Sequence, residues 1–112
     1  MATWPVAERI VGSRLAGAMA FDAARGRTVL FGGLTRLATS PVAVPGDTWE
    51  WDGSNWAKRA TTQAPPVRYG HAMAYDALRS RVVMFGGSLP TFGFLGDTWE
   101  WDGTAWLQRS TA

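Results

Sequence analysis

The sequence predicts an all-β protein made of two similar units. Several short stretches alternate with a period of two, which is typical of strands: small and larger side chains alternate in 72–75, and polar side chains alternate with tryptophan in 98–101. Polar and glycine-rich segments separate these stretches, and 13 of the 112 residues are glycine. No segment combines a helical hydrophobic period with capping residues, so we expect no helix.

An internal repeat covers nearly the whole chain. Residues 14–33 align with residues 68–87 at an offset of 54, with twelve of 20 positions identical. Residues 46–59 align with residues 96–109 at an offset of 50, with ten of 14 positions identical. The two offsets differ by four residues because one loop is longer in the first unit than in the second. The chain therefore contains two units of about 50 residues each.

Each unit is expected to form four short strands. In the first unit these are 18–21, 28–31, 48–51 and a strand that begins at Trp56; in the second they are 72–75, 82–85, 98–101 and a strand that begins at Trp106. Glycine pairs end the second strand of each unit, and Asp-Gly pairs at 52–53 and 102–103 predict tight hairpins with left-handed backbone. The recurring positions form the expected structural framework: Gly32, Gly33, Trp49, Trp51, Trp56, Gly86, Gly87, Trp99, Trp101 and Trp106.

The order of these motifs resembles the kelch repeat. A glycine pair follows a hydrophobic strand, the run DTWEWDG comes next, and a tryptophan follows a few residues later. In the second unit, Arg68, Gly70 and His71 are also similar to the start of a kelch unit, whereas the first unit has Ala16 and Gly17 in place of Gly70 and His71. The resemblance spans residues 14–109. It implies two four-stranded antiparallel blades of a β-propeller, at 14–59 and 60–112.

Two blades cannot close a propeller ring. An isolated pair would leave two outer faces with large apolar side chains in water, which is costly and promotes aggregation. We therefore expect the chain to assemble with itself, with a trimer of six blades preferred and a tetramer of eight second. Residues 1–13, which contain Trp4 and Arg9, are a possible closing strand. The chain begins with Met1, which favours a complete polypeptide; a fragment of a longer kelch protein is the alternative.

The composition argues against most kinds of catalytic site. There is no cysteine, so disulfides and thiolate metal sites are excluded, and His71 is the only histidine. We expect His71 to be a structural, hydrogen-bonded residue. The carboxylates Asp47, Glu50, Asp97 and Glu100 recur in both units as framework residues do, and Arg27 and Arg81 are expected to pair with the two glutamates. We therefore expect a protein without enzymatic activity, cofactor or metal.

The expected partners are copies of the chain and a protein or glycan ligand. The net charge of +2 comes from scattered arginines, so nucleic-acid binding is not expected. No apolar run approaches the length of a membrane span and no signal peptide is evident, so we expect a soluble chain, with no compartment specified.

Ligand contacts are expected on the loops that differ between the units, because variable loops on a rigid framework often carry binding residues. Strand alternation brings the segments 34–45, 59–67 and 88–95 to one end of the sheets. The candidate contacts there are Arg36, Arg59, Arg68, Phe92 and Phe94. The function predicted is a binding scaffold in a self-assembled ring. The alternative is a carbohydrate-binding, lectin-like ring, because tryptophans also stack on sugar rings.

Overall fold

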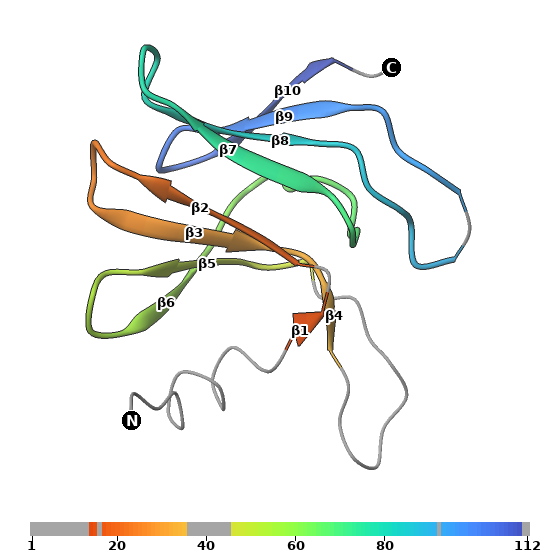
Figure 1. Cartoon of the computed structure of the whole chain (residues 1–112), viewed down its shortest axis with the longest axis horizontal. Helices are drawn as coiled ribbons and strands as arrows, with labels where there is room; N and C mark the ends of the chain where they lie inside the picture. Colours follow the sequence, from red (N-terminus) through yellow and green to blue (C-terminus); the bar gives the residue numbers. More distant parts are fainter. Residues whose placement is uncertain (1–13, 16, 36–45, 92, 111–112) are drawn as a thin grey trace.

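The computed structural model confirms the all-β fold. It describes residues 14–15, 17–35, 46–91 and 93–110, and within these ranges it contains strands and no helix. Figure 1 shows two sheets, one above the other, the first built from strands of the first unit and the second from strands of the second unit. Among the described residues, none belongs to a helix long and apolar enough to cross a membrane.

The first sheet is a four-stranded antiparallel meander with the order β2-β3-β5-β6. Its strands are β2 (Ala18–Asp22), β3 (Arg27–Phe31), β5 (Thr48–Trp51) and β6 (Trp56–Arg59). A two-stranded ribbon, β1 (Arg14–Leu15) with β4 (Leu34–Thr35), lies beside it. The ribbon was not predicted from the sequence, whereas the four longer strands agree with the prediction to within one residue.

The second sheet repeats this arrangement with the order β7-β8-β9-β10. Its strands are β7 (Ala72–Asp76), β8 (Arg81–Phe85), β9 (Thr98–Trp101) and β10 (Trp106–Ser110). The registers match those of the first sheet: Val29 is opposite Glu50 in one, and Val83 is opposite Glu100 in the other. The two sheets therefore fit two blade-like units related by the sequence repeat.

The hairpins between the third and fourth strands differ from the prediction in one respect. Gly53 and Gly103 have positive φ values of 103° and 100°, but neither preceding aspartate does. Instead, the carboxylate of Asp102 accepts hydrogen bonds from the backbone N–H groups of Thr104 and Ala105, both at 2.8 Å. Each hairpin is therefore a four-residue loop held by its aspartate, as in an Asx turn, and not a two-residue turn.

Each sheet has two chemically different faces, because successive side chains point to opposite sides. We call the side that carries the tryptophans the indole face: Trp49, Trp51 and Trp56 in the first sheet, and Trp99, Trp101 and Trp106 in the second. We call the other side, which carries Glu50 or Glu100, the carboxylate face. The strand registers place Val29 and Phe31 on the carboxylate face of the first sheet.

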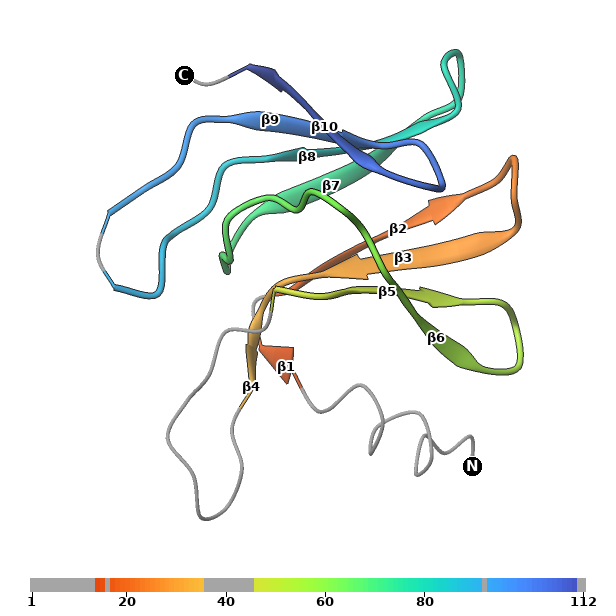
Figure 2. The ribbon, with the colours of Figure 1, turned by 180° about the vertical axis from the view of Figure 1, so that it is seen from behind.

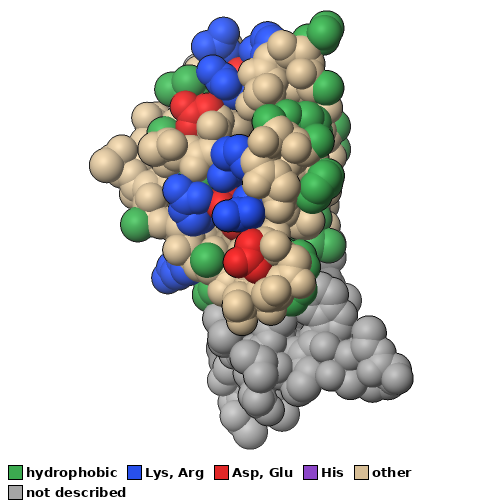
Figure 3. Space-filling model, turned by 90° about the vertical axis from the view of Figure 1, so that its left-hand side faces the viewer, with side chains coloured by type: hydrophobic (Ala, Val, Ile, Leu, Met, Phe, Trp, Pro, Cys, Tyr) green, Lys and Arg blue, Asp and Glu red, His purple; other side chains and the backbone are tan. Residues whose placement is uncertain are grey.

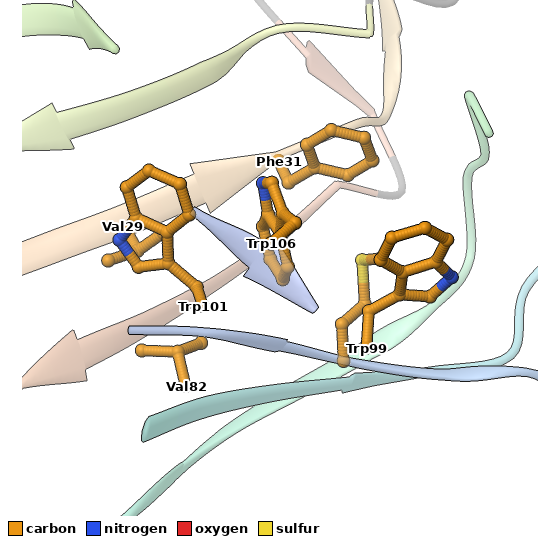
Figure 4. Close-up of a cluster of buried hydrophobic side chains, with 7 residues drawn as sticks. Val29, Phe31, Val82, Trp99, Trp101 and Trp106 are labelled. Carbon is orange, nitrogen blue, oxygen red and sulfur yellow. The ribbon is translucent and has the colours of Figure 1, made fainter. Parts of the chain in front are cut away.

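The indole face of the second sheet packs on the carboxylate face of the first. The core between them contains Val29 and Phe31 from the first sheet and Val82, Met84, Trp99, Trp101 and Trp106 from the second, all buried. Figure 4 shows Phe31 beside Trp106, whose ring centroids are 5.5 Å apart at an angle of 65°. The contact is head to tail, because two different faces meet.

The glycine pairs at the ends of β3 and β8 are required by the backbone. Gly87 has a φ of 104°, and a Cβ placed there would lie 2.9 Å from both the Cβ of His71 and the carbonyl oxygen of Tyr69. Such positions favour glycine because a side chain strains the left-handed backbone and meets these atoms.

Replacing Gly87 with valine should therefore lower the free energy of unfolding by about 1–3 kcal/mol. Urea denaturation of the variant beside the wild type measures this change. Gly26 is the matched control, since its φ is also positive, at 67°, but a Cβ added there would meet no described atom within 4 Å. A Gly87→Val protein no less stable than Gly26→Val would contradict the steric argument.

Candidate functional site

The junction between the two sheets is organised around a buried carboxylate. Glu50 accepts hydrogen bonds from the Arg25 Nη2 at 2.5 Å, the Arg59 Nη1 at 2.7 Å and the Trp101 Nε1 at 3.0 Å. Burial raises the pKa of Glu50, but these hydrogen bonds outweigh it and hold that pKa below its ordinary value. Glu50 is therefore a charged anchor that ties the second sheet to the first.

The arginine partner of each glutamate differs from the prediction. Arg25 and Arg79, from the β2–β3 and β7–β8 turns, pair with Glu50 and Glu100, whereas Arg27 and Arg81 donate to the backbone carbonyl oxygens of Arg25 and Arg79. The turn arginines reach the glutamates because each is also held by the aspartate three residues earlier, such as Asp22. Figure 3 shows a column of basic and acidic side chains at the end of the molecule that carries these turns.

Further hydrogen bonds cross the same junction. The Trp106 Nε1 donates to the Thr48 Oγ1 at 2.9 Å, and the backbone N–H of Ala24 donates to the Tyr75 hydroxyl at 3.2 Å. The backbone N–H of Gly33 donates to the Arg68 carbonyl oxygen at 3.0 Å. The two sheets thus join through specific polar contacts as well as through apolar packing.

His71 is buried and hydrogen-bonded. Its Nε2 lies 2.8 Å from the Phe31 carbonyl oxygen of the first sheet, and its ring meets the Phe31 ring edge-on at 6.1 Å. Burial lowers the pKa of His71 below its ordinary value, although the hydrogen bond to Phe31 acts in the opposite direction. A neutral imidazole that donates from Nε2 is therefore the form that fits this position.

The strand ends that the variable segments connect lie together at the opposite end of the sheets. The registers put the ends of β3, β6 and β8 and the starts of β5, β7 and β9 at this end. Figure 2 shows the connection from β6 to β7 passing from the first sheet to the second. Among the candidate contacts, Arg36 and Phe92 lie outside the described residues.

The other three candidate contacts have different environments. Phe94 is 89% exposed on the β8–β9 loop, as a ligand contact requires. Arg59 is half-buried, and its guanidinium pairs with Glu50 and lies 5.8 Å from the centre of the Trp101 ring. Arg68 is fully buried, and its guanidinium binds both oxygens of Asp97, at 2.6 and 2.9 Å. The prediction that Arg68 contacts a ligand is therefore wrong: the side chain is part of the framework.

Two pockets open near this end. One, of about 540 Å³, is lined by Gly46, Asp47, Thr48, Lys58, Arg59, Ala60, Thr61 and Ala64. The other, of about 380 Å³, is lined by Gly70, Ala72, Phe85, Gly86, Gly87, Ser88, Phe94 and Leu95. The second pocket was not predicted. Phe85 on its wall is exposed although its counterpart Phe31 is buried, and the signal in the sequence is that Gly17 stands where the second unit has His71.

Within the described part of the chain, no three His, Asp or Glu side chains group closely enough to hold a metal ion. The buried carboxylates are instead paired with arginines and indole N–H groups. These pairs join strands within a sheet or join the two sheets, and this arrangement is what a framework needs.

A scan against protein-family models gave no match, and neither did a search of curated proteins. The class that the fold defines is an all-β protein of two repeated four-stranded antiparallel sheets, compatible with two propeller blades.

Proposed function

We propose that the chain is a two-blade, kelch-type propeller unit that assembles head to tail with further copies into a ring and serves there as a non-enzymatic binding scaffold. The observation that carries this proposal is the junction between the sheets. It joins an indole face to a carboxylate face, and the outer surfaces of the pair are one face of each kind. A head-to-tail contact of this type forms a ring when its rotation closes.

Two exposed apolar residues support this arrangement, because they fall at positions that the internal junction uses. Phe21 and Leu78 are 57% and 98% exposed. Their repeat counterparts are Tyr75 and Ala24, which meet across the internal junction. If a second copy repeats that junction, Leu78 of one copy meets Phe21 of the next, and an apolar contact replaces the internal hydrogen bond.

The polar residues of the outer faces follow the same equivalence. Arg79 pairs with Glu100 as Arg25 pairs with Glu50. Inside the chain, Arg25 also lies against the β9–β10 hairpin, where a Cβ added to Gly103 would be 2.6 Å from the Arg25 Nε. The counterpart of Gly103 is Gly53, where an added Cβ would have no atom within 4 Å. In a ring, Arg79 of one copy would cover Gly53 of the next.

Identical two-blade units give only even numbers of blades. A trimer with six blades is the proposed assembly, and a tetramer with eight is the second choice. The connecting segments of all copies would then lie at one end of the ring, so that exposed residues such as Phe94 recur around it. Repetition of a site favours multivalent binding.

A carbohydrate-binding ring is less well supported. That alternative depends on tryptophans exposed as stacking platforms, whereas Trp49, Trp99, Trp101 and Trp106 are buried. We therefore propose protein-binding or other loop-based recognition as the role of the ring.

The molar mass of the chain in solution tests the assembly. Multi-angle light scattering should give about three times 12.2 kDa for the wild type. Replacing Phe21 with aspartate should weaken assembly at least about tenfold, because an unpaired charge would be buried at each junction. Since Phe21 is exposed in the single chain, its replacement should leave the fold intact.

Leu107→Asp is the matched control for Phe21→Asp. Leu107 is also an exposed apolar residue on an outer face, but its counterpart Ala57 is exposed and lies outside the internal junction. This variant should assemble like the wild type. Adding Leu78→Lys to Phe21→Asp should restore part of the assembly by pairing opposite charges. A folded wild-type monomer at micromolar concentration would contradict the proposal, as would equal effects of the two aspartate variants.

A further inference from the structure

The outer face of the second sheet has a pocket beside Phe85. At the matching place in the first sheet, beside Phe31, the internal junction fills the corresponding space. Phe85 and Gly86 line the pocket of about 380 Å³, together with Phe94 and Leu95. Their counterparts in the first sheet are Phe31 and Gly32. There, the imidazole of His71 lies against both residues, with its Nε2 2.8 Å from the Phe31 carbonyl oxygen.

The fit at Phe31 leaves no room for a further group. A Cβ added to Gly32 would lie 2.7 Å from the His71 Cε1 and 2.6 Å from the Arg68 carbonyl oxygen. At the pocket, by contrast, the Leu95 carbonyl oxygen, at 3.4 Å, is the one atom of the described residues that a Cβ added to Gly86 would meet within 4 Å. The places beside Phe31 and Phe85 therefore have the same backbone pattern, but the His71 ring fills the first and the second is open.

The repeat explains what happens when another copy covers the pocket. The residue that corresponds to His71 is Gly17, which has no side chain to insert. We infer that each junction between copies keeps a site for a neutral, planar heteroaromatic ring with an N–H donor, bounded by Phe85 and Phe94 of one copy and Gly17 of the next. This inference rests on the proposed head-to-tail assembly, since the site is incomplete in a single chain.

The chemistry of the lining matches such a ring. The Phe85 carbonyl oxygen corresponds to the acceptor that His71 uses, and the Phe85 ring corresponds to the Phe31 ring that meets the imidazole edge-on. The described residues that line the pocket include no charged side chain, so a cation would lose its hydration without gaining a partner. A pocket with mostly apolar walls and few polar groups is typical of small-molecule sites.

Imidazole itself is the probe, because it is the group that His71 supplies at the internal junction. The titration is followed by backbone amide shifts in NMR spectra at about pH 8, where an imidazole with a pKa near 6.5 is neutral. Imidazole should bind the wild type saturably, in the millimolar range expected for so small a ligand. The amide signals of Gly86 and Gly87 should shift most.

Two variants of Gly17 separate the site from general binding. Gly17→His should supply the missing ring and reduce imidazole affinity at least about tenfold. Gly17→Ala is the matched control: its Cβ would meet the Gly32 carbonyl oxygen at 3.3 Å, a tight contact, but would leave the pocket open. This variant should bind imidazole like the wild type. His71→Gly should open a second site at Phe31 and add a second set of shifts there.

Light scattering on the same samples distinguishes failure of this inference from failure of the assembly. A wild type that assembles but shows no saturable shifts at Gly86 and Gly87 would overturn the inference alone. A Gly17→His variant that assembles and binds imidazole as well as Gly17→Ala does would also overturn it. A wild-type monomer would overturn the assembly first, and the site with it.

Discussion

Trp101→Ala is expected to lower the free energy of unfolding by about 3–5 kcal/mol, the usual cost of removing a large buried aromatic side chain. Trp101 has no exposed surface and packs against Trp106 in the core between the sheets, with the two ring centroids 5.4 Å apart. The substitution also removes the indole N–H that bonds Glu50. Because small domains are stable by only about 5–15 kcal/mol, much of the stability of this chain depends on that one ring. Urea denaturation measures the loss.

Trp101→Phe is the control in case the alanine variant does not fold. Phenylalanine keeps an aromatic ring in the core and loses the N–H donor, while Glu50 keeps its two arginine partners. This variant should therefore fold and should lose less stability than Trp101→Ala. If both variants were as stable as the wild type, Trp101 would not be a framework residue, and a role as a ligand platform would become the better explanation.

The strands could be predicted from sequence because each carries its own signal. Alternation defines Thr48–Trp51 and Thr98–Trp101, and the glycine pairs end the preceding strands where the backbone has positive φ. The repeat adds a second, independent copy of every signal. The pairing within the hairpins β2–β3, β5–β6, β7–β8 and β9–β10 then follows from the short connections between those strands.

The orientation of the two sheets could not be predicted in the same way. Which face of one sheet covers which face of the other depends on contacts between residues about 50 positions apart, such as Trp101 with Glu50 and Trp106 with Thr48. The arginine partners were wrong for a related reason. Arg27 follows the strand pattern, but Arg25 lies in a turn that Asp22 holds in the conformation needed to reach Glu50.

The candidate site was predicted only in its general location. The ends of β3, β6 and β8 lie at one end of the sheets, and Phe94 is exposed there, but Arg68 is buried against Asp97. The sequence contains a signal for this pair: an arginine and an aspartate also stand at the matching positions Arg14 and Asp47 of the first unit. A pair that recurs with the repeat is more consistent with framework than with recognition. The Phe85 pocket was missed because it depends on a difference between the units, in which Gly17 stands where the second unit has His71.

Arg68→Met is expected to cost about 3–5 kcal/mol at neutral pH, the range for removing one partner of a buried ion pair. Methionine occupies similar space but leaves the Asp97 carboxylate with the Trp99 Nε1 as its remaining side-chain donor among the described residues. The carbonyl oxygens of Gly86 and Pro66 also lose the guanidinium that they accept from. A ligand-contacting arginine would show no such effect on stability.

The pH dependence gives a second measurement of the same pair. The hydrogen bonds from Arg68 hold the pKa of Asp97 below its ordinary value of 3.8, although burial acts against them. The pair therefore stabilises the wild type above about pH 4, and that contribution is lost as the pH falls through the lowered pKa. In Arg68→Met, burial without a cation should raise the pKa of Asp97, so the carboxyl becomes neutral at a higher pH.

The stability difference between the wild type and Arg68→Met should therefore be largest near pH 7 and should shrink as the pH approaches 4. Urea denaturation across this range measures it, and Arg68→Met/Asp97→Asn is the control. The double variant carries no charge at either position of this pair, so it should recover part of the stability at pH 7 and should lose the pH dependence that belongs to Asp97. An Arg68→Met variant with unchanged stability at pH 7 would return Arg68 to the candidate ligand contacts. A difference that did not shrink toward pH 4 would mean that packing of the arginine side chain, and not its charge, makes the contribution.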